Sequence, residues 1–281
     1  MVKIAQQSMQ SLMLTMRLNG TELASGTGFI VRTAKGLALI TTRHNLTGRY
    51  QGTGKPIAPN GAVPNEIVIL HPAPFDKNRF NPQWEARVEP LYSEGTLEGA
   101  RLWKEHPAFG SRVDVVLLPL TQTRGIAPVP HAVNEGATIA VTCAEPVSVV
   151  GFPFAITAGG RFAVWANGFV ASELEADYND LPLFLIDCRT RPGQSGAPVL
   201  AQRTGLVTLT DGRKLPAIGT ATRFLGMYSG RVHKDADLGM VWKASAIQDL
   251  IDALGPPITL FKLWPASHPP ATPATRHSPT P

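Results

Sequence analysis

The sequence predicts an all-β protein built from two barrels or sandwiches, and three observations support this prediction. The chain has 281 residues, of which 26 are glycine and 25 are proline, so it is expected to turn often between short strands. Short apolar runs bounded by such turn residues recur in both halves of the chain. Residues 121–134 have few strand signals and three breakers, and they separate the two halves.

The first half predicts a series of strands that begins with a hairpin. Residues 8–18 and 21–32 are expected to pair through Asn19-Gly20, a strong signal for a two-residue hairpin turn. Residues 36–42 form the next expected strand, which runs directly into Arg43 and His44. The remaining segments are expected to be a loop at 49–64, strands at 65–70, 84–92 and 112–120, and irregular structure at 93–111.

Glycines at positions 26 and 28 interrupt the second expected strand. No helix follows them and no Lys-Ser or Lys-Thr pair ends them, which argues against a phosphate-binding loop. Glycine inside a strand more often marks a place where two backbones pack closely, and this is the expectation here.

The second half again predicts short strands, followed by one helix. Strands are expected at 137–143, 147–152, 162–172, 183–189, 197–202, 217–231 and 238–243. Residues 244–254 carry apolar side chains at helical spacing and are followed by Gly255 and two prolines, so they form the best predicted helix. Residues 265–281 consist mainly of Pro, Ala, Ser and Thr, and we expect them to be disordered.

Charge and composition exclude several classes of function. The net charge is only +5 and the basic residues are scattered, so no nucleic-acid partner is expected. Neither a signal peptide nor an apolar run of about eighteen residues is found, which predicts a cytoplasmic protein without a membrane span. Cys143 and Cys188 are expected to be free thiols, although a disulfide between them stays open.

No metal or other cofactor is expected. The two cysteines have no cysteine or histidine partners at zinc spacing. His233 with Asp235 and Asp237 could form a metal site or an acid–base pair, but a solvated loop between strands is the favoured interpretation.

The turn Gly193-Gln194-Ser195-Gly196 is the first candidate for a catalytic site. By itself it fits two interpretations, a surface turn or a nucleophile held where flanking glycines let a substrate approach. A serine nucleophile needs a base to remove its proton and a carboxylate to orient that base. His44 follows a buried strand and Asp114 opens an apolar one, so both lie where rigid strands would hold them.

With these residues in the order His44, Asp114, Ser195, the sequence resembles the chymotrypsin-like (trypsin-fold) serine peptidases, in particular the bacterial trypsin-like and HtrA-like branch without a PDZ domain. The resemblance covers roughly residues 8–254. It rests on five short motifs in the correct order and a final helix, the motifs being Ile40-Thr41-Thr42-Arg43-His44-Asn45, Val113-Asp114-Val115-Val116-Leu117, Pro192-Gly193-Gln194-Ser195-Gly196-Ala197-Pro198, Gly226-Met227-Tyr228-Ser229-Gly230 and Leu238-Gly239-Met240-Val241-Trp242.

The resemblance implies two six-stranded antiparallel β-barrels with a C-terminal helix. The peptidase domain would span residues 1–262, with the first barrel at 8–125, the second at 133–244 and the helix at 245–254, before a Pro-rich tail at 263–281. The site would lie between the barrels and act on a protein or peptide substrate.

The resemblance also implies a role for each site residue. His44 would be the general base, Asp114 would orient it, Ser195 would be the nucleophile, and the N–H groups of Gly193 and Ser195 would form the oxyanion hole. Asp76 is a poor second choice for the orienting carboxylate. The pocket for the side chain before the scissile bond would be lined by Arg189, Thr190, Arg191, Ser229, Gly230, Arg231 and Gly239.

Two departures from the family pattern carry further expectations. Gln194 replaces the aspartate that pairs with a newly cut N-terminus in secreted zymogens, so activation by N-terminal cleavage is not expected. Arg189 stands at the pocket base, where it could favour an acidic substrate side chain if it points inward.

Two competing functions were weighed. An α/β-hydrolase would need a helix after the serine and a different order of the triad, and residues 197–199 continue as a strand instead. The alternative is a protease-fold module that binds a protein or peptide without cutting it. The intact trio argues against this alternative, because an inactive relative usually loses at least one member, but a slow or conditionally active regulator would look the same in sequence.

Overall fold

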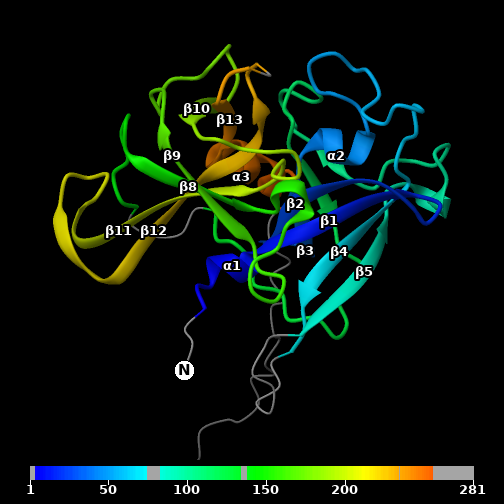
Figure 1. Cartoon of the computed structure of the whole chain (residues 1–281), viewed down its shortest axis with the longest axis horizontal. Helices are drawn as coiled ribbons and strands as arrows, with labels where there is room; N and C mark the ends of the chain where they lie inside the picture. The colour runs from blue at the N-terminus through cyan, green and yellow to red at the C-terminus, as the bar shows by residue number, and fades with distance from the viewer. Residues whose placement is uncertain (1–3, 75–82, 134–137, 234, 256–281) are drawn as a thin grey trace, which may run out of the picture.

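The structure is a computed structural model that describes residues 4–74, 83–133, 138–233 and 235–255 (Figure 1). It confirms the all-β class with a C-terminal helix. The strands form one seven-stranded sheet from the first half of the chain and one closed barrel of six strands from the second half. The Pro-rich tail and Asp76 lie outside the described residues.

The seven-stranded sheet is antiparallel and begins with the predicted hairpin. Asn19 and Gly20 both have positive φ, 50° and 84°, as a turn between β1 and β2 that matches the strand twist requires. The sheet order is β5-β4-β1-β2-β3-β7-β6, with β1 at Ser11–Leu18, β2 at Thr21–Thr33, β3 at Gly36–Thr41, β4 at Glu66–Pro72, β5 at Trp84–Pro90, β6 at Lys104–Glu105 and β7 at Val116–Pro119.

The two edges of this sheet are connected beyond the ends of β5 and β6. Tyr92 forms an antiparallel bridge with Arg101, and the Leu102 N–H donates to the Leu91 carbonyl at 3.0 Å. The irregular segment between β5 and β6 therefore joins the two edges of the sheet. The sheet curls around its own apolar core.

The second half forms the closed six-stranded barrel. Its order is β10-β13-β12-β11-β8-β9, with β8 at Pro146–Gly151, β9 at Val164–Val170, β10 at Leu183–Asp187, β11 at Pro198–Thr208, β12 at Lys214–Arg231 and β13 at Leu238–Lys243. β11 and β12 are longer than predicted and form a hairpin that extends beyond the barrel (Figure 1).

A shared core joins the sheet, the barrel and the C-terminal helix α3 (Ala244–Asp252). Phe29 and Ile40 of the sheet, Met227 and Trp242 of the barrel and Leu250 of α3 belong to one cluster of buried apolar side chains. The two halves are thus packed together over an extended surface, and this packing sets the relative position of residues from each half.

Three predicted segments differ from the structure. The strand expected from residue 8 begins instead with a short helix, α1 (Gln7–Gln10), whose Ser8 Oγ accepts a hydrogen bond from Trp165 Nε1 at 2.9 Å. Of the expected strand at 137–143, the described residues 138–143 form one bridge, between Ile139 and Leu209, because the chain turns at Thr142, whose N–H donates to the Glu145 carboxylate. The irregular segment 93–111 contains the two-residue strand β6.

No helix among the described residues is both long and apolar enough to cross a membrane. Cys143 is exposed, Cys188 is buried, and both are free thiols.

Candidate active site

His44 and Asp114 lie at the same end of two neighbouring strands of the first sheet. His44 is in the short helix α2 (Arg43–Thr47), one turn that follows β3 and ends at Gly48, whose φ of +63° is left-handed. Asp114 stands just before β7, and Thr41 of β3 pairs with Val116 of β7. The pairing of the strands therefore brings the histidine next to the carboxylate.

The Asp114 carboxylate holds the histidine by two hydrogen bonds. His44 Nδ1 lies 2.7 Å from Asp114 Oδ2, and the His44 backbone N–H donates to Asp114 Oδ1 at 2.9 Å. Asp114 is buried. A carboxylate that faces Nδ1 places the imidazole proton there and leaves Nε2 as the basic nitrogen.

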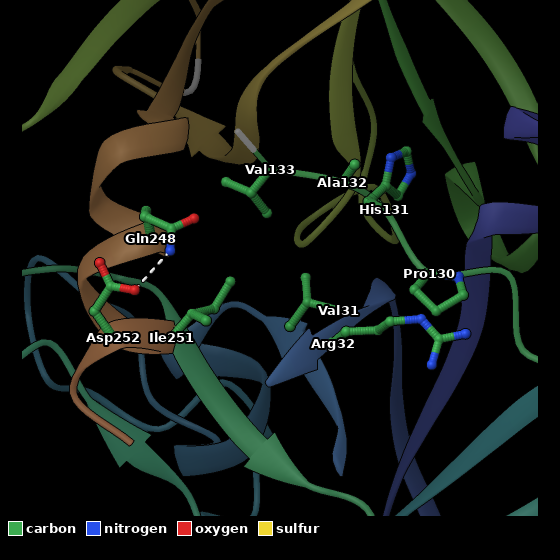
Figure 2. Close-up of a pocket in the computed structure, with 9 residues that line it drawn as sticks. All are labelled: Val31, Arg32, Pro130, His131, Ala132, Val133, Gln248, Ile251 and Asp252. Carbon is green, nitrogen blue, oxygen red and sulfur yellow. Dashed lines mark hydrogen bonds between the residues drawn. The ribbon is translucent and has the colours of Figure 1, made fainter. Parts of the chain in front are cut away.

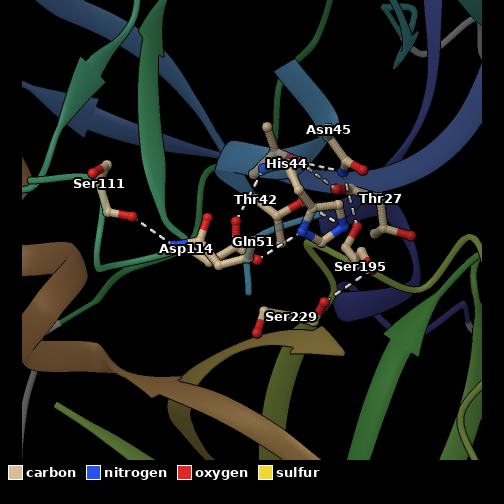
Figure 3. A network of polar contacts seen from close by, with 10 residues as sticks. Thr27, Thr42, His44, Asn45, Gln51, Ser111, Asp114, Ser195 and Ser229 are labelled. Carbon is tan, nitrogen blue, oxygen red and sulfur yellow. Dashed lines mark hydrogen bonds and ion pairs between the residues drawn. The ribbon is translucent and has the colours of Figure 1, made fainter. Parts of the chain in front are cut away.

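Ser195 comes from the second half of the chain, on the loop before β11. It lies on the side of the His44 ring opposite to Asp114 (Figure 3). Its hydroxyl donates to the Ser229 carbonyl at 3.0 Å. No hydrogen bond joins Ser195 to His44, and the near contact of His44 Nε2 is the Thr42 hydroxyl at 3.4 Å. The structure thus brings the three predicted residues together but leaves the serine hydroxyl turned away from the base.

The loop around Ser195 presents two free N–H groups. Gly193 and Gly196 have φ values of +94° and +93°, and a Cβ at Gly196 would lie 1.9 Å from the Thr27 carbonyl oxygen. Both positions therefore require glycine. The N–H groups of Gly193 and Ser195 have no hydrogen-bond partner among the described residues, so they can donate to a ligand oxygen.

The Gln194 side chain forms a hydrogen bond within this loop. This side chain is buried, and its Oε1 accepts a hydrogen bond from the Arg191 N–H at 2.8 Å. The bond closes the turn that ends at Ser195, so the conformation of the loop is fixed by a neutral side chain within it.

Thr27, Thr41 and Asn45 connect the loop to the first sheet, and the sequence motifs did not predict this role for any of them. The Thr27 N–H donates to the Ser195 carbonyl at 2.9 Å, and the Asn45 amide donates to the same carbonyl at 3.2 Å. The Thr41 hydroxyl donates to the Thr27 carbonyl at 2.8 Å. The glycine at position 26 was a usable signal, because a Cβ there would lie 2.6 Å from the Asn45 amide nitrogen.

The expected pocket residues lie in different environments. The Arg189 side chain is 78% exposed and 3.9 Å from the Asp237 carboxylate, so it points to solvent. Arg191 donates to the Thr190 carbonyl at 2.9 Å, and Arg231 is exposed. Thr190, Ser229 and Gly239 are buried. Gly230, the remaining residue of this set, is partly exposed.

Two other groups of candidates lie apart from His44, Asp114 and Ser195 in character. Burial, followed by the charges of Asp187 and Asp237, raises the pKa of Cys188 to about 11, so this thiol stays protonated near neutral pH. His233 and Asp235 are exposed in the turn between β12 and β13.

A cavity of about 660 Å³ lies elsewhere, between α3 and the segment that joins the two halves (Figure 2). Its lining includes Val31, His131 and Ile251, and none of the predicted site residues.

Comparison with known proteins gives one match to a family model and several to solved structures. The model of the trypsin-like peptidase domain matches residues 26–208. A serine endoprotease from Yersinia pestis has 13% identity and a TM-score of 0.46, and the match covers 90% of this chain and 68% of that one. The active form of the Rv3671c protease from M. tuberculosis has 16% identity and a TM-score of 0.44, with 89% and 82% covered. No curated protein sequence matches the chain.

Proposed function

We propose that this chain, which belongs to the trypsin-like peptidase family, is a serine endopeptidase with the catalytic triad His44, Asp114 and Ser195. The observation that carries the proposal is the double hydrogen bond of the buried Asp114 carboxylate to His44, at 2.7 and 2.9 Å. It supports a fixed tautomer and a fixed ring orientation, which a general base beside a serine needs. The substrate is a protein or peptide.

In the proposed reaction, Ser195 Oγ attacks the carbonyl carbon of the scissile peptide bond while its proton passes to His44 Nε2. The serine hydroxyl must first turn from the Ser229 carbonyl toward His44, which is a rotation about one side-chain bond. The negative charge that develops on the carbonyl oxygen is stabilised by the N–H groups of Gly193 and Ser195, the proposed oxyanion hole.

The second half of the reaction returns the enzyme to its starting state. The C–N bond breaks as His44 gives its proton to the departing amine, which leaves an acyl ester on Ser195. Water then attacks the ester, His44 takes the proton from this water, and the acid is released as the proton returns to Ser195 Oγ. Asp114 stays ionised throughout and stabilises the imidazolium.

We further propose that no N-terminal cleavage is needed to form the oxyanion hole. A neutral amide such as that of Gln194 cannot form an ion pair with an N-terminal ammonium, and its hydrogen bond from the Arg191 N–H supports a loop that is already held in place. The proposed peptidase domain covers residues 1–262, with its first half at 8–125, which contains the seven-stranded sheet, its second half at 133–244, which contains the closed barrel, and the helix at 245–254.

One observation favours a second candidate function, a module that binds a peptide without cutting it. The Ser195 hydroxyl donates to Ser229 and has no hydrogen bond to His44. In such a module this arrangement would persist when a peptide is bound, and the serine would stay unreactive.

Labelling with a fluorophosphonate probe separates the two functions, because the probe reacts only with an activated serine. The wild-type protein is expected to label, and Ser195→Ala and His44→Ala are expected not to. Ser111→Ala is a matched control that removes a serine outside the proposed triad and should label as the wild type does. A wild type that does not label, or a Ser195→Ala protein that labels equally, would overturn the endopeptidase proposal.

A further inference from the structure

Tyr228 lies directly beside the proposed nucleophile. Its N–H donates to the Ala197 carbonyl at 2.8 Å, and its carbonyl accepts the Gly196 N–H at 2.8 Å. The next residue is Ser229, whose carbonyl accepts the Ser195 hydroxyl. The backbone of Tyr228 is therefore fixed against the chain that carries Ser195, and its side chain is buried in the apolar core of the second barrel.

The ring of Tyr228 extends from β12 to the segment before the Ser195 loop. Its hydroxyl lies 2.5 Å from the Thr190 hydroxyl, and the two residues are only 3% and 1% exposed. The ring packs over Gly239 of β13, where a Cβ would lie 2.7 Å from Tyr228 Cε2. Gly239 thus makes the room that the ring occupies.

This path crosses the space that a substrate side chain would enter. In the binding mode that the proposed function implies, the peptide carbonyl oxygen binds the Gly193 and Ser195 N–H groups, and the preceding side chain enters between residues 190–192 and residues 229–231. The hydroxyl contact between Thr190 and Tyr228 joins these two walls, so the ring forms a floor. A Cβ at Gly230 would meet no atom within 4 Å, so no other residue covers the backbone of the second wall at this point.

The positive charge of Arg189 does not lie at this floor. That side chain is exposed and lies near Asp237, outside the buried space. The buried hydroxyls of Thr190 and Tyr228 contact each other. A long or charged substrate side chain would have to displace the ring and leave these hydroxyls unpaired, which is unfavourable for buried polar groups.

We infer that Tyr228 is a specificity-determining residue that restricts the side chain before the scissile bond to small, uncharged types such as those of alanine, glycine and serine. The inference rests on the proposed function for the direction in which the peptide binds. It replaces the acidic preference that Arg189 alone could have suggested.

Binding to the Ser195→Ala protein tests the pocket without needing turnover. Fluorescently labelled peptides that differ only in their C-terminal residue (Ala, Leu, Phe, Lys or Glu) mimic the product that carries this side chain. The alanine peptide is expected to bind at least about ten-fold more tightly than the others, as pockets that reject additional carbon groups commonly achieve. Equal or tighter binding of the Leu, Phe, Lys or Glu peptide would overturn the inference.

Variants of Tyr228 in the same background identify the residue responsible. Tyr228→Ala and the less disruptive Tyr228→Val should improve binding of the Leu peptide by about ten-fold and leave the Ala peptide nearly unchanged. Tyr228→Phe keeps the ring and should keep the wild-type ranking, as should Tyr178→Ala, which removes a tyrosine elsewhere. If Tyr228→Val folds, as judged by its melting temperature, and its ranking matches that of the parent, the ring is not the floor of the pocket.

Failure of this inference is distinguishable from failure of the proposed function. A protein that labels with fluorophosphonate but binds the Phe peptide best retains the peptidase proposal and loses the pocket. A protein that does not label but binds the Ala peptide best, with the Tyr228 dependence given above, retains the pocket and loses the proposed catalysis.

Discussion

The hydroxyl of Thr27 donates a 2.7 Å hydrogen bond to the carbonyl of Gly193, a residue 166 positions further along the chain. The same hydroxyl accepts the Phe152 N–H at 3.1 Å. One side chain of the first sheet therefore contacts two segments of the second barrel, including the proposed oxyanion hole. The arrangement of that hole depends on how the two halves pack together.

Thr27→Val should weaken the Ser195 loop. The substitution preserves the shape of the side chain and leaves the Gly193 carbonyl and the Phe152 N–H without this partner, at a cost of about 1–3 kcal/mol for a buried group. We expect kcat/KM to fall by about ten-fold and the melting temperature to decrease. Thr27→Ser, which keeps the hydroxyl, should behave nearly as the wild type, and a Thr27→Val protein with unchanged kinetics would show that the contact does not position the loop.

Asp114→Asn should lower kcat by about four orders of magnitude while the fold is retained. An amide in place of the carboxylate can donate to Nδ1 and so favours the tautomer whose Nε2 carries the proton and cannot accept one. The pH dependence of kcat on a peptide substrate measures this change. Asp211→Asn, which alters an exposed carboxylate next to Arg213, is the control and should have normal kcat. Near-normal hydrolysis by Asp114→Asn would assign the orienting role to another carboxylate.

Gln194→Ala should lower kcat, because the Ser195 loop depends on this side chain. N-terminal cleavage should not be needed for activity of the wild type. Loss of the Oε1 acceptor frees the Arg191 N–H and loosens the turn that ends at Ser195, so kcat should fall by about ten-fold or more. Intact-mass analysis of fluorophosphonate-labelled wild type should find the adduct on the uncut chain. Labelling that occurs only on a chain cleaved near its N-terminus would contradict the proposal that the loop forms without cleavage. Gln202→Ala changes a glutamine outside the loop and is the control, with an expected kcat like that of the wild type.

Acid should destabilise the protein below about pH 6.5, because burial lowers the pKa of three histidines in the folded state, His71, His106 and His131, and most strongly those of His71 and His131. Burial, with a smaller contribution from Arg87, lowers the pKa of His71 to about 4, and burial lowers the pKa of His131 to about 3. Between the unfolded value of 6.5 and about 4, the unfolded chain binds more protons at these sites than the folded chain does. The free energy of unfolding is therefore highest above this window and falls as pH decreases through it, by about 1.4 kcal/mol per pH unit for each histidine.

Urea unfolding at several pH values between about 7 and 4.5 measures this slope. His131 packs against Phe29 and Phe224, with ring centroids 5.2 and 5.3 Å apart, so His131→Phe is a variant that keeps an aromatic ring in place. It should reduce the slope by about 1.4 kcal/mol per pH unit relative to the wild type. The exposed His233→Gln should leave the slope unchanged, and an unchanged slope for His131→Phe would show that His131 is not the source.

Features that depend on local pattern could be predicted from the amino-acid order alone. The Asn19-Gly20 hairpin, the strands on either side of it and the helix that begins at Ala244 follow from turn chemistry and periodicity, which report on one element at a time. Motifs at three separate places nominated His44, Asp114 and Ser195, because the chemistry of a triad restricts the residue types that can form it.

Features that depend on contacts between distant segments became visible only in the folded protein. Trp165 holds Ser8 in a helical turn where periodicity favoured a strand, and the pairing of β3 with β7 sets the distance from His44 to Asp114. Thr27 and Tyr228 look like ordinary strand residues in sequence. Folding places Thr27 beside Gly193 and Tyr228 against Thr190, and only these contacts make the two residues important. Local sequence patterns do not predict contacts between residues so far apart in the chain.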